Sequence, residues 1–285
     1  MPDIYLCSFA SPSLNLSVQR FTYEAEELNF YKKIKVYRKN DLSKEIINRI
    51  ENFNYPIKKM RLYGYACWKP YIINKFFEQL PENSILQYTD IGCHFNKRGI
   101  NRLREYIEIC NQNNVLVFQY RNPDWKEKYK KLKFQKYFEY EYTKADTWEN
   151  MYIDKNSNLL TTEQIWSGCL FIKKNTIGKK ILDDWNKFSK NDILINDDKS
   201  KSKNHENFKD HRHDQSIFSI ICKREKVFSL SVSECEWAEK ENIRTWEHLN
   251  NFPILAKRDK KYNLFKRFLN RQIRNFKRRW FRNYE

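Results

Sequence analysis

Imidazole, carboxylate and amide side chains occur together between His211 and Gln215, directly before an apolar run that ends near Cys222. Asp214 or His213 is well placed to cap a helix over that run, which is a sufficient structural role. The same groups at the edge of a buried element could also carry acid–base chemistry. His211 and His213 are spaced to share one face of an extended segment, which makes them candidate metal ligands.

Asp90 is a second candidate, because it directly follows the apolar run 84–89. Ligands of open α/β sheets collect at the carboxyl ends of strands, where a carboxylate can hold a ribose hydroxyl or a divalent cation. Gly92 would let the backbone approach such a ligand closely. The structural alternative is that Asp90 caps the turn after its strand.

Lys69 and Gly168 complete the set of candidates. Lys69 precedes Pro70, which suits the first turn of a helix, and an ammonium beside a helix N-terminus makes a site for a diphosphate. A solvated lysine is the alternative. Gly168 lies just before an apolar strand, where it would either let a sugar approach the backbone or serve as an ordinary turn glycine.

Alternating strand and helix patterns must position these residues. Apolar runs predict strands at 4–9, 34–37, 84–89, 115–120, 169–172 and 227–232. Helical spacing of apolar residues predicts helices around Ile50, from Pro70, after Asn96, at 177–188 and at 216–222. This order predicts a single α/β domain whose mainly parallel sheet is flanked by helices. The polar stretch 190–210 predicts a mobile surface loop.

Composition restricts the class of protein. The chain has 285 residues, a net charge of +18 and seven scattered cysteines with no Cys-x-x-Cys pair, which predicts reduced thiols and no zinc site. No signal-peptide pattern and no run of about 18 apolar residues occurs, so we expect a cytoplasmic protein. Dinucleotide, P-loop, zincin and serine-hydrolase motifs are absent from the sequence, which argues against those enzyme classes.

The end of the sequence is strongly basic. Residues 260–285 carry +9, half of the net charge in less than a tenth of the chain. Apolar residues recur at helical spacing from Leu264 to Trp280, so we expect a basic amphipathic helix at 258–285 beside a catalytic domain at 1–257. Such a helix would lie on the anionic inner face of the cytoplasmic membrane. Alternatively, its apolar stripe packs on the catalytic domain.

Five segments together resemble bacterial capsule and lipooligosaccharide glycosyltransferases with the type-A (GT-A), Rossmann-like fold that binds nucleotide-diphospho-sugars. In the family's order they are 63–73 (YGYACWKPYII), 84–96 (SILQYTDIGCHFN), 142–146 (YTKAD), 164–173 (QIWSGCLFIK) and 211–220 (HRHDQSIFSI). The resemblance implies transfer of a sugar from a nucleotide-diphosphate donor to a growing capsular or lipooligosaccharide acceptor, either a polysaccharide or a lipid-linked sugar.

The resemblance also assigns donor-binding roles. Ser8 and Ser11 would lie near the nucleotide base and ribose, Lys69 would meet the diphosphate, and Gly168 would line the donor sugar. Asp214 and Gln215, with His213 beside them, would contact the sugar or act at the reacting centre. Asp214 is the candidate base, or the stabiliser of an oxocarbenium-like centre.

Metal binding departs from the family pattern. Asp90 stands at the first position of the Asp-x-Asp motif that binds the metal and the nucleotide, but Gly92 replaces the second Asp. The resemblance implies a divalent cation, Mn²⁺ or Mg²⁺, held by Asp90 with His94, His211 or His213. Alternatively, lysine and arginine side chains replace the metal.

Two rival functions remain at this level. The same fold could transfer another group, such as a phosphoramidate or a polyol phosphate, to a polysaccharide. A sequence pI near 9.4 with many aromatic residues also suits a nucleic-acid-binding protein. No recognisable nucleic-acid-binding motif is present, so we expect no nucleic-acid partner.

Overall fold

The computed structural model describes residues 1–53, 61–257, 268, 269 and 272. Its main sheet has the strand order β2-β1-β3-β6-β5-β7, and every strand except β6 runs in the same direction. These six strands are β1 (Ile4–Phe9), β2 (Lys33–Tyr37), β3 (Ile85–Thr89), β5 (Val115–Gln119), β6 (Ile165–Lys173) and β7 (Phe228–Ser231). Two short antiparallel pairs are β4 (His94–Phe95) with β10 (Ile254–Leu255), and β8 (Ala238–Lys240) with β9 (Ile243–Thr245).

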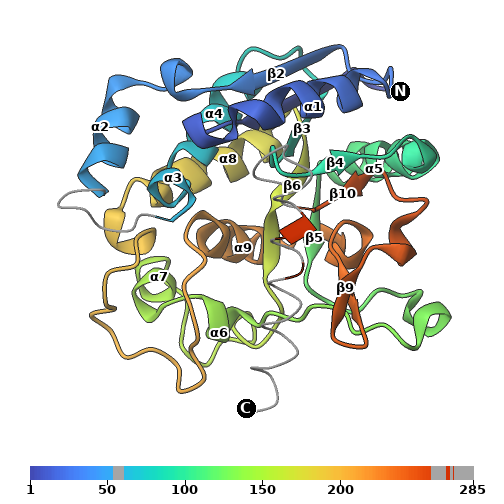
Figure 1. Cartoon of the computed structure of the whole chain (residues 1–285). Helices are drawn as coiled ribbons and strands as arrows, with labels where there is room; N and C mark the ends of the chain where they lie inside the picture. The colour runs from blue at the N-terminus through green and yellow to red at the C-terminus, as the bar shows by residue number, and fades with distance from the viewer. Residues whose placement is uncertain (54–60, 258–267, 270–271, 273–285) are drawn as a thin grey trace.

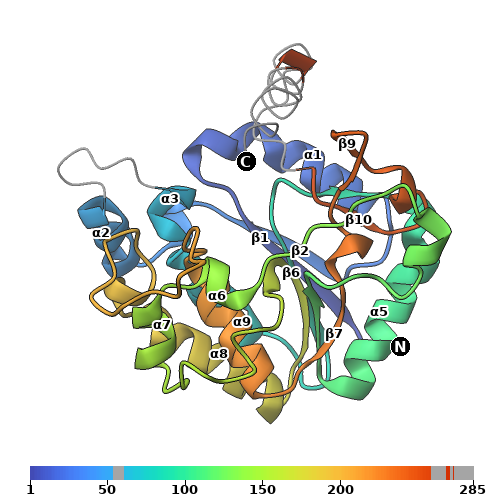
Figure 2. The ribbon, with the colours of Figure 1, turned by 90° about the horizontal axis from the view of Figure 1, so that it is seen from below.

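Helices cover both faces of the sheet (Figures 1 and 2). One face carries α2 (Lys44–Phe53), α4 (Trp68–Phe77), α8 (Thr176–Ser189) and α9 (Asp214–Arg224). The other face carries α1 (Asn15–Glu26) and α5 (Ile100–Asn113). Shorter helices are α3 (Leu62–Tyr65), α6 (Glu139–Tyr142) and α7 (Ala145–Asn150). The 3₁₀ turns are η1 (Pro12–Leu14), η2 (Lys39–Asp41), η3 (Lys97–Gly99), η4 (Lys126–Tyr129), η5 (Asp192–Leu194), η6 (Val232–Glu234) and η7 (Glu247–Leu249).

The alternation of side chains along the strands creates two cores. In β1, Cys7 and Phe9 pack towards α4, whereas Ile4 and Leu6 pack towards α1 and α5. Because both faces of the sheet are covered, the central strands are buried on both sides, and even polar residues such as Gln87 and Ser167 are buried. All five residues of β3 are buried. The rigid sheet therefore holds the residue that follows β3, Asp90, in a fixed place.

The predicted α/β class with a mainly parallel sheet flanked by helices is confirmed, and each predicted strand is present within a few residues. Three details differ. The strand predicted at 169–172 is the second half of β6, which runs antiparallel to β3 and β5. Helix α1 has no counterpart among the predicted helices. Pro70 is the third residue of α4, two positions later than expected.

The prediction of a mobile loop at 190–210 was wrong for its first part. Leu194, Ile195 and Asn196 are buried, and η5 packs against α7 and α8. The segment is charged overall, but it contains apolar side chains that cover the edge of the core near α9. These side chains are buried, so this part of the segment is not a mobile surface loop.

The basic amphipathic helix predicted at 258–285 lies almost entirely outside the described residues. Among the described residues, no helix combines the length and the apolar character that a membrane crossing requires.

Candidate active site

A cleft of about 710 Å³ opens at the carboxyl ends of β1 and β3. The segment 61–69, the residues after β3, the start of β6 and the start of α9 all contribute side chains. The antiparallel direction of β6 is what brings its first residues to this edge. Seven of the ten predicted site residues line the cleft: Ser11, Lys69, Asp90, Gly92, His213, Asp214 and Gln215.

The ammonium group of Lys69 lies between two carboxylates in this cleft. Its Nζ is 3.2 Å from Asp90 Oδ1 and 3.2 Å from Asp214 Oδ2. Lys69 Nζ also lies 3.3 Å from Ser167 Oγ and 3.4 Å from the Ser167 carbonyl oxygen, to both of which it donates. Three segments far apart in sequence thus meet at one cation.

The first turn of α4 holds Lys69 in the interior, where the residue is only 5% exposed. Its ammonium lies 5.3 Å from the centre of the Tyr88 ring, within the range of a cation–π contact. Because a charged amine is rarely buried without partners, the two aspartates are what make this position tolerable. A solvated lysine, the alternative considered from the sequence, is not what the structure shows.

Asp214 is the first residue of α9 and is 2% exposed. Its Oδ2 accepts a 2.8 Å hydrogen bond from Ser167 Oγ, and its backbone oxygen accepts one of 3.1 Å from Trp185 Nε1. The N-cap residue of α9 is His213, which makes no side-chain capping hydrogen bond. Neither residue therefore caps the helix with its side chain, and the carboxylate of Asp214 is directed to Lys69 and Ser167.

The pKa values of Asp214 and Lys69, which form a buried ion pair, are shifted by different causes. Burial raises the pKa of Asp214, although Lys69 and Ser167 favour its ionised form. Burial alone would lower the pKa of Lys69, but Asp214 and Asp90 outweigh it, so its pKa lies above the usual value. Lys69 is therefore a permanent cation at physiological pH, held next to a carboxylate that takes up a proton more readily than an exposed one.

Asp90 is the more accessible of the two aspartates, because its side chain is 41% exposed compared with 2% for Asp214. Tyr88 donates a 2.7 Å hydrogen bond from its hydroxyl to Asp90 Oδ1, and burial raises the pKa of Tyr88, so it stays a donor. The turn after β3 is closed by the backbone oxygen of Asp90, which accepts from the Cys93 N–H. The carboxylate is thus free of the capping role and faces the cleft.

The two histidines are held by the segment around η5. His211 Nε2 is 2.9 Å from the Leu194 carbonyl oxygen, and its Nδ1 accepts from the Lys144 N–H. His213 Nδ1 is 2.8 Å from the Ile195 carbonyl oxygen. Burial lowers the pKa of His213 to about 4, with the Ile195 hydrogen bond opposing the shift, and it also lowers the pKa of His211 well below its usual value. Both rings are therefore neutral at physiological pH.

The residues predicted to hold a divalent cation do not form such a site. His211 does not line the cleft, and both of its ring nitrogens already have partners. His94 is paired with Glu24 at 2.8 Å. Within the described part of the chain, no three His, Cys, Asp or Glu side chains lie close enough together to bind a metal ion. The donor set therefore does not fit the metal that the resemblance implies.

Ser8 and Gly168 also lie away from the cleft lining. Ser8 is fully buried and donates a 2.7 Å hydrogen bond to the Thr89 carbonyl oxygen, which ties β1 to β3. A Cβ atom on Gly168 would come within 2.2 Å of the Trp166 ring. The missing side chain of Gly168 thus makes room for this indole, while Ser167 points to the opposite face, towards Lys69.

Basic residues that sequence reasoning did not single out complete the cleft. Arg61 forms a two-point ion pair with Asp210, with N–O distances of 2.8 and 2.9 Å. Arg212 lies over the rings of Tyr137 and Tyr142, 4.2 and 4.6 Å from their ring centres. Across the residues that the structure describes, no carboxylate forms an ion pair with Arg212. Its charge is therefore available to an anionic ligand.

One wall of the cleft is aromatic. Phe9 stacks on Trp68 with 4.0 Å between ring centres and on Tyr63 with 6.0 Å. Tyr63 belongs to an unusual run of left-handed residues: Leu62, Tyr63, Gly64, Tyr65 and Ala66. Each non-glycine residue in this conformation costs about 1–2 kcal/mol, and such strain concentrates at functional sites.

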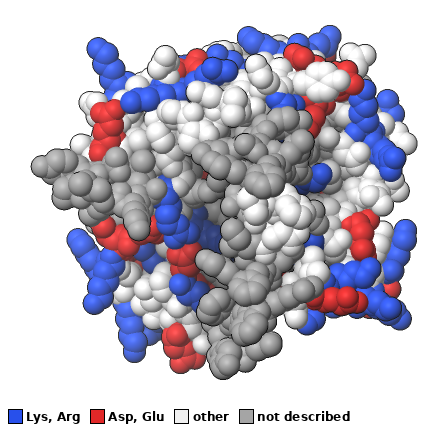
Figure 3. All heavy atoms as spheres, in the orientation of Figure 1, with Lys and Arg blue, Asp and Glu red and all other residues white. Residues whose placement is uncertain are grey.

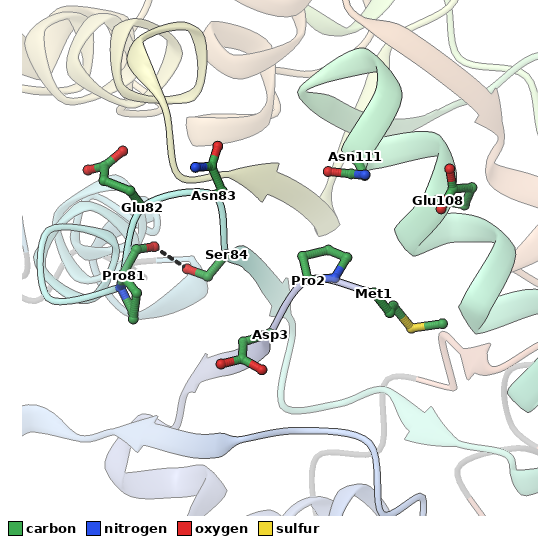
Figure 4. Close-up of a pocket in the computed structure, with 9 residues that line it drawn as sticks. All are labelled: Met1, Pro2, Asp3, Pro81, Glu82, Asn83, Ser84, Glu108 and Asn111. Atoms are coloured by element: carbon green, nitrogen blue, oxygen red, sulfur yellow. Dashed lines mark hydrogen bonds between the residues drawn. The ribbon is translucent and has the colours of Figure 1, made fainter.

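A second hollow, of about 400 Å³, lies at the amino ends of β1 and β3 (Figure 4). Its charged lining consists of Asp3, Glu82 and Glu108, with no lysine, arginine or histidine among the lining residues. An acidic hollow with no basic side chain in its lining is a poor site for a phosphate group. Among the residues that Figure 3 colours, acidic and basic side chains are interspersed.

No protein-family model matches this chain, and no curated protein matches it. Among solved structures, it is similar to a glycosyltransferase involved in glycosylation of the major capsid of PBCV-1, with 10% identity and a TM-score of 0.48. That alignment covers 94% of this chain and 100% of the other.

Two further similarities are weaker. The apo form of mouse xyloside xylosyltransferase 1 has 9% identity and a TM-score of 0.42, covering 82% of this chain and 87% of the other. The galactosyltransferase LgtC, in complex with donor and acceptor sugar analogues, has 10% identity and a TM-score of 0.42, covering 82% and 75%.

Proposed function

We propose that this chain is a glycosyltransferase that binds a nucleotide-diphosphate sugar in the cleft and transfers the sugar to an acceptor hydroxyl. The observation that carries the proposal is the ammonium of Lys69 held between Asp90 and Asp214 at the carboxyl ends of the strands. Binding sites of α/β sheets lie at this edge, and a volume of about 710 Å³ suits a ligand of this size.

The nucleotide would lie along the aromatic wall of Phe9, Tyr63 and Trp68, where a planar base can stack. Asp90, which is exposed to the cleft, is the group that accepts hydrogen bonds from the ribose hydroxyls. Ser11 lines the same end of the cleft and supplies a further hydroxyl.

The diphosphate would lie over Lys69. Because two carboxylates already share the charge of Lys69, the site needs more positive charge to hold a diphosphate. Arg212 supplies it from the same cleft, fixed in place by its two tyrosine neighbours. Both cations then meet the charge that develops on the leaving group.

In the reaction, the bond between the anomeric carbon and the diphosphate oxygen breaks, and its electron pair leaves with the nucleotide diphosphate. A bond forms from the anomeric carbon to the acceptor oxygen, whose proton passes to a base. Asp214 is the candidate base or the stabiliser of the cationic sugar, since its raised pKa suits proton uptake. Gln215 is held by a 2.9 Å hydrogen bond to Gln164 and orients the sugar.

We further propose a capsular or lipooligosaccharide acceptor and a place at the inner face of the cytoplasmic membrane. The support is the sequence of residues 260–285, whose charge of +9 and apolar spacing suit an anionic lipid surface. A lipid-linked acceptor would be met at that surface.

The function can be tested by screening UDP-, GDP- and CDP-sugars for thermal stabilisation of the full chain. A true donor at a hundred times its dissociation constant adds about 2.7 kcal/mol to the free energy of unfolding. Lys69→Met should abolish the effect, whereas Glu82→Gln, in the acidic hollow at the opposite edge of the sheet, should preserve it. If no nucleotide sugar stabilises the wild-type chain, the proposed function is wrong.

A further inference from the structure

A divalent cation at a diphosphate site needs several oxygen or nitrogen donors converging on one point. This cleft offers few. Gly92 has no side chain, and His211 has partners at both ring nitrogens. His213 directs Nδ1 to a backbone carbonyl, and its Nε2 faces Asp197 Oδ1 at 3.7 Å, a carboxylate that does not line the cleft. Asp210 also lines the cleft, but Arg61 pairs with both of its oxygens. Two carboxylates remain, Asp90 and Asp214, and they share one neighbour.

That neighbour is Lys69. Its ammonium occupies the place between the two carboxylates that a bridging metal ion would take, 3.2 Å from an oxygen of each. Lys69 cannot easily withdraw, because it is buried against the rings of Trp68 and Tyr88 and hydrogen-bonded to Ser167. A metal ion bound to the same oxygens would therefore face a fixed positive charge at close range.

We infer that Lys69 replaces the divalent cation in this site, an inference that rests on the proposed function. When the bond to the anomeric carbon breaks and its electron pair leaves with the nucleotide diphosphate, the Lys69 ammonium neutralises the developing charge. No metal ion takes part, and nucleotide-sugar binding and transfer are independent of divalent cations.

The unequal exposure of the two aspartates shows how the ammonium becomes available. Lys69 has three N–H donors, and Asp90, Asp214 and Ser167 use them all. Asp214 is buried and stays, whereas the exposed carboxylate of Asp90 can turn towards the ribose. The diphosphate then replaces Asp90 as a hydrogen-bond acceptor of Lys69, while Asp214 keeps the ammonium in place.

The first experiment measures Mn²⁺ binding to the full chain by electron paramagnetic resonance, without any nucleotide. Wild type and Asp90→Asn should bind Mn²⁺ equally weakly, because Lys69 already occupies the carboxylate pair. One Mn²⁺ per wild-type chain that Asp90→Asn loses would overturn the inference. This measurement does not depend on the identity of the donor, so it separates the inference from the proposed function.

The second experiment compares the affinity of each UDP-, GDP- or CDP-sugar that binds, in excess EDTA and in millimolar Mn²⁺. We expect affinities equal within about twofold in wild type, which needs no variant and so avoids any folding defect. Lys69→Met should lose at least about tenfold in both media. Binding that Mn²⁺ strengthens tenfold, or that survives in folded Lys69→Met, would contradict the inference. If no nucleotide sugar binds, the proposed function fails, whatever the Mn²⁺ result.

Discussion

Ser167 Oγ donates a 2.8 Å hydrogen bond to Asp214 Oδ2, the oxygen that also lies 3.2 Å from the ammonium of Lys69. This links the antiparallel strand β6, the first residue of α9 and the first turn of α4 at a single carboxylate. Because all three elements belong to the rigid core, Asp214 is held in one orientation before any ligand binds. Such preorganisation is what a charge-stabilising group requires.

Removing the negative charge of Asp214 should lower turnover far more than it lowers the affinity for the nucleotide sugar. Asp214→Asn keeps the shape of the side chain and can still accept from Ser167, but it cannot take up a proton. We expect turnover per folded molecule to fall at least about a hundredfold, the scale of a lost acid–base or charge-stabilising group. Asp210→Asn is the matched control, because Asp210 lines the same cleft but pairs with Arg61. Equal turnover in both variants would remove Asp214 from the chemistry.

Removing the side chain of Asp90 should weaken the binding of the nucleotide-sugar donor. Asp90→Ala deletes the proposed ribose contact, and we expect the affinity for the nucleotide sugar to fall at least about tenfold, as measured by calorimetry. The fold should persist, because the side chain is 41% exposed and Asp214 still neutralises Lys69. An unchanged affinity would show that Asp90 lies outside the nucleotide site.

Gly168→Ala separates packing from sugar binding at that residue. The added Cβ would lie 2.2 Å from two atoms of the Trp166 ring, which is too close for any real contact. We expect a loss of about 1–3 kcal/mol in the free energy of unfolding, as for other overpacked cores. Urea denaturation measures the loss. Unchanged stability together with weaker donor binding would instead support the role along the donor sugar that the family resemblance implied.

The sequence predicted the strands well because both faces of the sheet are buried, which leaves largely apolar runs such as 115–120. It could not predict the direction of β6. That strand pairs with β3 and β5, which are distant in sequence, and no local pattern distinguishes an antiparallel from a parallel neighbour. Helix α1 was missed because its buried residues are interrupted by exposed ones such as Leu16 and Tyr23.

The candidate site was predictable as single residues but not as a cluster. Lys69, Asp90 and Asp214 were each noticeable at the edge of an apolar segment, yet their meeting depends on long-range packing. Ser167 could have been found from strand alternation, since a residue next to Gly168 must face the other side of the sheet. Arg212 gives no such signal, because its tyrosine neighbours come from a separate segment.

The basic C-terminal segment predicts membrane binding. Truncation after Lys257 removes residues 258–285 and should release the protein from vesicles of anionic lipid, while transfer to a soluble acceptor persists. Each engaged basic residue contributes about 1 kcal/mol at an anionic surface, and this attraction weakens as salt is raised. Sedimentation with vesicles measures the effect, with neutral vesicles as the control. Equal binding by the truncated chain would contradict a membrane role for the segment.

His213 should make the stability of the fold depend on pH. Burial lowers its pKa to about 4 from an ordinary value near 6.5, so the folded state favours the neutral ring. Because the pKa of His213 is lower in the folded protein than in the unfolded chain, its contribution to stability is complete above the pKa of the unfolded chain. This contribution is lost as the pH falls through the pKa of the folded protein. The window therefore runs from about pH 6.5 down to about pH 4, and the loss is about 3 kcal/mol from this residue.

The test is urea denaturation of wild type and His213→Gln at several values of pH across that window. Glutamine does not titrate, so the variant should show a smaller loss of stability between pH 6.5 and pH 4, whatever its stability at neutral pH. The stability of the variant will still depend on pH, because burial also lowers the pKa of His211 and His248. His205→Gln, at an exposed histidine, controls for the removal of one imidazole. If the wild type and His213→Gln lose stability equally, His213 accepts a proton in the folded state as readily as in the unfolded chain.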